Sequence, residues 1–138
     1  MENDKLNRIF QLQRVLIEEL VKVDDVHLPV DVTSQNGQKL CREVVLRATE
    51  ELHEALTMLK LWKNHKHVAD NVDFDHNAFL EEIVDSLHYI FELLIFVDIG
   101  AEQLFQAYRR KHQINMERVK DKLQRMKVEV ENENEDDC

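Results

Sequence analysis

The sequence predicts an all-α protein, a four- to five-helix bundle assembled as a homo-oligomer. Three observations predict the helices. The 138 residues include only two glycines and one proline, whereas a β-sandwich or barrel draws heavily on both for its tight turns. Apolar residues make up 43% of the chain, which is enough to bury a core. They recur three and four positions apart in long segments, as on one face of a helix.

The first two helices are expected at residues 4–23 and 38–63. Between them, residues 24–37 hold the single proline and a polar run, so we expect a loop there. The first helix repeats apolar residues at helical spacing: Leu6, Ile9, Phe10, Leu12, Leu16, Ile17 and Leu20. The second does so with Val44, Val45, Ala48, Leu52, Ala55, Leu56 and Leu59.

The third helix is expected at residues 77–97, where Asp75 or Asn77 is suited to cap the first turn. It is apolar almost all round, so we expect it to be buried on most sides. Gly100 interrupts it, and a fourth helix follows from Ala101 to about Met126. The sequence therefore predicts one folded domain, residues 1–126. It is followed by an acidic tail without fixed structure, residues 127–138.

The formal charge of −10, from 28 acidic and 18 basic residues, argues against two classes of partner. Nucleic acid and anionic membrane surfaces would both be repelled, so we expect neither to bind. The most apolar run, residues 90–97, is interrupted by Glu92 and is too short to span a bilayer. The only cysteines, Cys41 and Cys138, form no disulfide framework, which fits a reducing compartment. We therefore expect a cytoplasmic protein.

Two acidic pairs carry the first chemical signal. Glu51 and Glu54 lie on the second expected helix, and Glu82 and Asp85 lie on the third. The spacing of three residues puts both carboxylates of a pair on one side of a helix, at the border of its apolar face. A single pair is usually a solvated surface, but a second pair on an otherwise apolar helix needs a reason.

Side-by-side packing of these two helices would bring four carboxylates together. Each ionised carboxylate disfavours ionisation of the next, so such a cluster calls for a cation. Mg²⁺ prefers oxygen ligands and bridges to substrate phosphates. A divalent ion with a spare carboxylate as base is suited to the attack of water on phosphorus.

A polar stripe on the fourth helix has the complementary charge. Its four residues fall within roughly 80° of arc at helical spacing: Tyr108, Lys111, Asn115 and Arg118. Two cations and an amide in line are suited to holding phosphates and a sugar. By itself such a stripe is more often a solvated face of a helix. It indicates a binding site only in combination with the acidic pairs.

Together these motifs resemble the dimeric all-α dUTPases, a branch of the all-α nucleoside triphosphate pyrophosphohydrolases that include the MazG-like enzymes. The resemblance covers residues 12 to 118. Four segments carry it: Glu51-x-x-Glu54, Leu61-Trp62-Lys63-Asn64, Glu82-Ile-Val-Asp85-Ser-Leu-His88 and Tyr108-x-x-Lys111-x-x-x-Asn115-x-x-Arg118. The paired acidic motif is common to the wider group, whereas the second and fourth segments are typical of the dUTPase branch.

The resemblance implies Mg²⁺-dependent hydrolysis of dUTP to the monophosphate and pyrophosphate. The implied catalytic, metal-binding residues are Glu51, Glu54, Glu82 and Asp85. The implied substrate-binding residues are Gln13, Trp62, Lys63, Tyr108, Lys111, Asn115 and Arg118. Gln13 matches the position that reads the pyrimidine edge, and Trp62 would wall the base pocket. A glutamine amide can turn to suit uracil or cytosine, so dCTP stays an alternative.

Other classes stay open on the sequence alone. The chain lacks an asparagine of the dUTPase pattern on the first helix and its closing motif, so a MazG-like enzyme of broader specificity is one alternative. Glu50-x-x-His53 and Asp85-x-x-His88 resemble the ligand unit of ferritin-like di-iron proteins, but the helical phase turns Glu50 and His53 toward solvent. A non-enzymatic helical adaptor would leave the carboxylates and the cationic stripe unexplained.

Apolar surface predicts the assembly. The helix at 77–97 is apolar on nearly every side, and the first helix has a second broad apolar face. A monomer would expose a larger patch than monomeric proteins usually tolerate, whereas a symmetric dimer buries it. The resemblance points the same way. We expect a homodimer, with a tetramer allowed.

Overall fold

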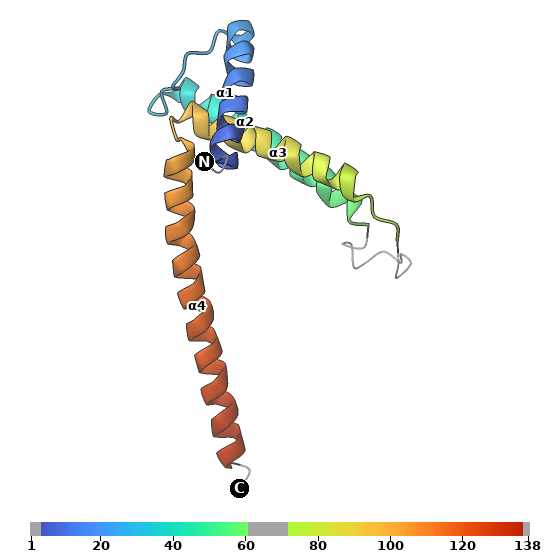
Figure 1. Ribbon diagram of the computed structural model, residues 1–138, viewed down its shortest axis with the longest axis vertical. Helices are drawn as coiled ribbons and strands as arrows, with labels where there is room; N and C mark the ends of the chain where they lie inside the picture. Colours follow the sequence, from blue (N-terminus) through green and yellow to red (C-terminus); the bar gives the residue numbers. More distant parts are fainter. Residues whose placement is uncertain (1–3, 61–71, 137–138) are drawn as a thin grey trace. The chain divides into compact units, whose positions relative to one another are not determined.

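The computed structural model describes residues 4–60 and 72–136, and all regular structure in these ranges is helical (Figure 1). The helices are α1 (Lys5–Asp24), α2 (Gln35–Met58), α3 (His76–Phe96) and α4 (Ala101–Asp136). The all-α fold class is confirmed. The chain forms two compact units, of which the first ends at Gly100 and contains α1 to α3, and the second contains α4. None of the helices in the described ranges is both long enough and apolar enough to cross a membrane.

Side-chain caps begin the first three helices. Asp4, Ser34 and Asp75 stand directly before α1, α2 and α3, and each accepts a hydrogen bond from the backbone N–H three residues later, at 3.0 to 3.1 Å. Such a bond satisfies one of the donors that a helix leaves unpaired at its start. Asp75 is confirmed as the cap of α3, and α1 and α3 begin and end within one residue of the expected positions.

The second helix differs from its expected bounds, 38–63, at both ends. It begins at Gln35 because Ser34 caps it from within the polar run that we assigned to the loop. It ends at Met58, where the next backbone N–H bonds to the carbonyl only three residues earlier, at 3.0 Å. Polar composition alone was therefore a poor guide to where this helix begins.

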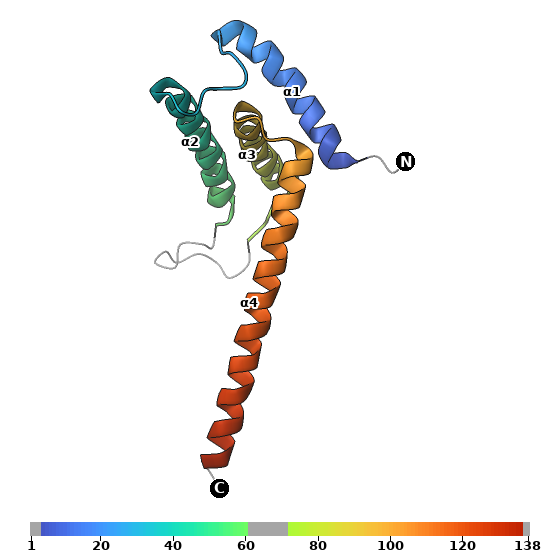
Figure 2. The same ribbon diagram turned by 90° about the vertical axis from the view of Figure 1, so that its left-hand side faces the viewer.

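Close packing joins the helices of the first unit: α2 lies along α3, and α1 contacts α3 (Figure 2). Ala48 of α2 is buried, and its carbonyl oxygen accepts a hydrogen bond from the buried Ser86 hydroxyl of α3 at 3.0 Å. Small side chains at such a contact let two helix backbones approach closely. Phe10 of α1 meets Phe91 of α3 edge to face, with ring centroids 5.1 Å apart. Through these contacts α3 packs against both α1 and α2.

Within one chain α3 is less buried than its apolar sequence suggests. Four of its apolar side chains keep between 39% and 58% of their surface exposed: Leu80, Val84, Leu87 and Ile90. In the first unit, only α1 and α2 are available to cover this helix. The expected burial on most sides is not reached by a single copy, and α3 presents an apolar surface.

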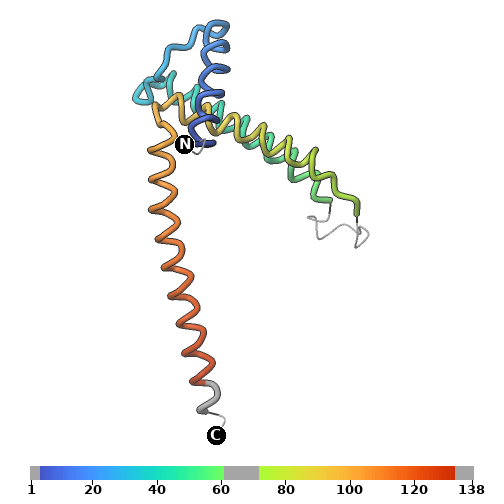
Figure 3. The backbone as a smooth tube through the Cα atoms, in the orientation of Figure 1, coloured from blue at the N-terminus to red at the C-terminus, as the bar shows by residue number. Residues whose placement is uncertain are grey.

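The fourth helix continues past its expected end near Met126 (Figure 3). Its bounds extend to Asp136. The segment from residue 127, which we expected to lack structure, belongs to the helix as far as Asp136. No glycine or proline follows Gly100, and lysine, arginine, glutamate and glutamine all have good helix propensity. The prediction weighed the charge of this segment and neglected its propensity.

Candidate functional site

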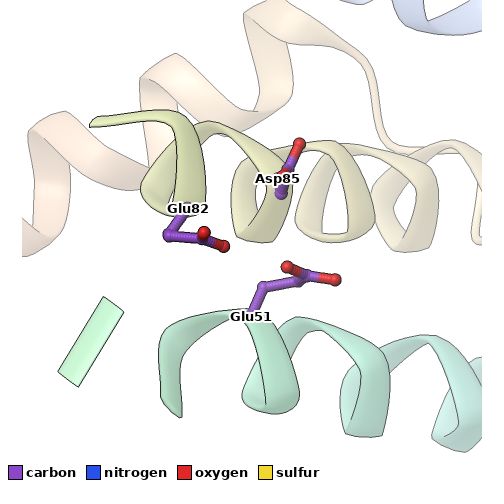
Figure 4. A group of neighbouring side chains, drawn as sticks. All are labelled: Glu51, Glu82 and Asp85. Carbon is purple, nitrogen blue, oxygen red and sulfur yellow. The ribbon is translucent and has the colours of Figure 1, made fainter. Parts of the chain in front are cut away.

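Three carboxylates from two facing helices form a cluster in the first unit. Glu51 of α2 and Glu82 and Asp85 of α3 each offer one oxygen, and these oxygens lie within 4.8 Å of one another. Figure 4 shows the side chains of Glu51 and Glu82 directed toward each other from the two helices. Glu51 and Glu82 are half-buried, whereas Asp85 is exposed. The packing of α2 along α3 thus joins members of both acidic pairs.

The fourth carboxylate of the predicted set, Glu54, lies beside this cluster. Its carboxyl lies close enough to that of Glu82 to raise the pKa of Glu82, through a hydrogen bond and through its charge. Glu54 itself is exposed. All four predicted acidic residues are therefore neighbours, with three of them close enough to share one cation.

The cluster shifts the proton affinity of its members. The pKa of Glu82 is raised above 4.5 by its burial, then by a hydrogen bond in which its protonated form donates to Glu54, and by the charges of Glu54, Asp85 and Glu51. The pKa of Glu51 is also raised above 4.5, by burial first and then by the charges of Glu54 and Asp85. Burial and the neighbouring charges both disfavour the ionised form of these two carboxyls. A divalent cation among the oxygens would offset both effects.

A cavity of about 370 Å³ is lined by residues of the carboxylate cluster and by residues of α1. Glu51 of α2 and Asp85 of α3 line it, and so does Gln13 of α1. Gln13 is a polar residue with only 4% of its surface exposed, and no hydrogen bond joins its side chain to another described residue. Because no fully enclosed polar atom in the described ranges lacks a partner, the Gln13 amide keeps contact with the open cavity. An unpaired, nearly buried amide facing a cavity is suited to bind a polar ligand.

Three further residues of α3 line the same cavity, and the resemblance assigned a role to none of them: His88, Tyr89 and Glu92. The Nδ1 atom of His88 lies 3.9 Å from a carboxylate oxygen of Asp85, which is too long for a hydrogen bond. Burial raises the pKa of Glu92, and the charge of Arg47 partly counters this. A signal for Glu92 was present, since it is the one charged residue in the run 90–97, but we used it only to argue against a membrane span.

The structure does not test the remaining predicted residues against this cavity. Trp62 and Lys63 lie outside the described residues, so their predicted roles are untested. Tyr108, Lys111, Asn115 and Arg118 lie on α4, where all four are exposed. Their helix forms the second unit, and the structure sets no distance between this stripe and the carboxylates.

Two observations bear on the alternatives. Glu50 and His53 are both exposed on α2 and take no part in the carboxylate cluster, as the helical phase predicts. Comparison of the chain with family models, with curated proteins and with solved structures finds no match. The carboxylates, the Gln13 amide and the cavity that they share are therefore the features that bear on function.

Proposed function

We propose that this protein is a Mg²⁺-dependent nucleoside triphosphate pyrophosphohydrolase that converts a deoxypyrimidine triphosphate to its monophosphate and pyrophosphate. dUTP is the substrate that the motif resemblance favours, and dCTP is the alternative. One observation carries the proposal: carboxylates from two facing helices line the same cavity as the unpaired amide of Gln13. A cation site beside an amide suits a ligand with phosphates at one end and a polar ring at the other.

The donor set fits Mg²⁺. Mg²⁺ binds oxygen ligands at about 2.1 Å, so two ligands on opposite sides of the ion are about 4.2 Å apart. This distance is close to the 4.8 Å within which the three carboxylate oxygens lie. Glu51, Glu82 and Asp85 would hold the ion, which supplies positive charge to the carboxylates and the triphosphate. One of Glu51 and Glu54 would orient the attacking water and take its proton.

The substrate's other groups would meet the remaining predicted residues. Gln13 offers both a donor and an acceptor, which matches the edge of a pyrimidine. Trp62 would wall the base. Lys111 and Arg118 would stabilise the charge of the departing pyrophosphate, with Tyr108 and Asn115 nearby on the same stripe.

We also propose that a second copy covers the apolar surface of the first unit. A groove of about 220 Å³ runs between α1 and α3. The apolar side chains that line it stay largely exposed in one chain: Ile9, Leu12, Leu16, Val84 and Leu87. Gln13 and His88 line this groove as well as the cavity of the carboxylates, so a copy docked here would border the substrate site. A symmetric dimer buries such a surface against itself.

A screen of all common ribo- and deoxynucleoside triphosphates with Mg²⁺ tests the proposal. The expected result is that dUTP or dCTP is cleaved fastest, with pyrophosphate as the product. Fastest cleavage of a purine nucleotide would leave the broader MazG-like reaction and remove the pyrimidine assignment. Absence of any pyrophosphate release would favour the adaptor.

A further inference from the structure

The fourth helix carries a row of apolar residues that the proposed function does not use. The row follows spacings of three and four residues, and each member keeps 45% to 56% of its surface exposed: Met116, Val119, Leu123, Met126 and Val130. We call these five residues the α4 seam. Residues repeated in this way stay on one face, and this is the pattern by which two helices pair in a coiled coil.

The charges of α4 are separated along its length. Residues 109–122 include six lysines and arginines and two acids, whereas residues 129–136 include five acids and no lysine or arginine. Acids are unfavourable at the carboxyl end of a helix, because the helix dipole is negative there. The last turn of α4 contains no basic residue to offset this. The acidic end therefore needs positive charge from outside its own turn.

We propose that α4 pairs antiparallel with the α4 helix of a second copy of this chain, seam against seam. Parallel pairing would place the two acidic ends side by side and the two basic segments side by side, which is repulsive at both. Antiparallel pairing sets residues 109–122 of one helix beside residues 129–136 of the other. The charge pattern therefore identifies both the occupant of the seam and its direction.

Among the registers that place seam residues opposite one another, the charges select one. When Leu123 of one helix faces Met126 of the other, Val119 faces Val130, and two-fold symmetry repeats both contacts. The register also sets Lys122 on one flank beside Glu129 of the second copy. The opposite flank brings Lys120 near Lys127, a like-charge pair. Exchanging the charges of Lys122 and Glu129 therefore tests the register.

Charge reversal in the full chain provides the test. Lys122→Glu and Glu129→Lys should each weaken self-association on the order of tenfold, because each converts two attractive contacts of the dimer to repulsive ones. The double variant restores the attraction with the signs exchanged and should recover most of the loss. Arg125→Glu and Asp121→Lys make the same charge changes away from the seam and serve as controls. Sedimentation equilibrium over a range of protein concentrations measures all of them.

A second measurement separates this contact from the one proposed for α1 and α3. Unlabelled and ¹⁵N-labelled chains are mixed and treated with a zero-length carbodiimide cross-linker. Within one helix Lys122 and Glu129 are about 10 Å apart along the axis, too far for a direct link. A link between Lys122 of one chain and Glu129 of the other is the expected product. Absence of this link, or a double variant as weak as the single variants, would overturn the pairing.

Discussion

The carboxyls of Glu51 and Glu82 bind their protons more tightly than isolated glutamates. Burial is the larger cause for both, and neighbouring acids add to it. The folded protein therefore keeps protons on these groups at pH values where the unfolded chain has released them. Folding stability consequently falls as the pH rises from about 4.5, the ordinary pKa of a glutamate, through the raised pKa values. At neutral pH without a metal ion, the cluster lowers the stability of the fold.

Replacing one of these acids should make the metal-free protein more stable. We predict that Glu82→Gln raises the melting temperature at pH 7 in the presence of a chelator, because it removes a repelled charge. The gain should shrink as the pH is lowered through the raised pKa values toward 4.5. Added Mg²⁺ should stabilise the wild type more than this variant. Glu81→Gln, at an exposed neighbour, is the control, and a lower melting temperature for Glu82→Gln in chelator would contradict the account.

Gln13 is the residue on which base recognition depends. Gln13→Leu keeps nearly the same side-chain shape and removes the amide, so two hydrogen bonds to the pyrimidine edge are lost. At roughly 1 kcal/mol for each bond, kcat/KM should fall about 10- to 100-fold. Gln11→Leu makes the same change at an exposed position of α1 and should have little effect. Steady-state kinetics with dUTP and dCTP measure both variants. A loss of kcat/KM in Gln13→Leu no larger than that in Gln11→Leu would remove Gln13 from the site.

The contact between α1 and α3 positions that glutamine. Phe10 is 3% exposed and meets Phe91 edge to face, less than one helical turn from Gln13. Phe10→Ala should lower the free energy of unfolding by about 3 to 5 kcal/mol, the usual cost of removing a buried aromatic ring. Val23→Ala, at a site 82% exposed on the same helix, should change it little. Urea denaturation distinguishes them, and similar midpoints would show that α1 is not held by this contact.

Local signals made some elements predictable from the sequence. α1 and α3 were placed within one residue because apolar spacing marks the extent of each, and because Asp75 stands at the start of α3 as a candidate cap. α2 and α4 were misplaced because Ser34 starts a helix inside a polar run, and because the charged residues after Met126 continue one. In both cases composition was weighed above capping and propensity.

The site was predictable where it depends on spacing within a helix. The two acidic pairs implied a shared location as soon as α2 and α3 were assumed to pack together, and the structure brings Glu51, Glu82 and Asp85 of these pairs into one cluster. Glu92 was not predicted as a cavity residue. Its position depends on how α1 rests on α3, and spacing along one helix contains no information about that contact.

The whole molecule exposes apolar surface on its first unit. If a second copy covers the groove between α1 and α3, a charge there should prevent association. Leu12 is 55% exposed in one chain and lines the groove. We predict that Leu12→Asp lowers the sedimenting mass at micromolar concentration while circular dichroism keeps the helical signal. Leu46→Asp, 56% exposed on α2, is the control, and an active wild-type monomer of 16.5 kDa would contradict the assembly.

Mg²⁺-dependent pyrophosphate release by the intact protein and its carboxylate variants tests the central claim most directly. With dUTP or dCTP as substrate, Glu51→Gln, Glu54→Gln and Glu82→Gln should each reduce kcat by about 100-fold or more, since each removes a cation ligand or the base. Glu50→Gln changes an exposed neighbour on the same helix and should stay near the wild-type rate. Circular dichroism checks that every variant is folded. Near-wild-type rates in all three site variants would contradict the account.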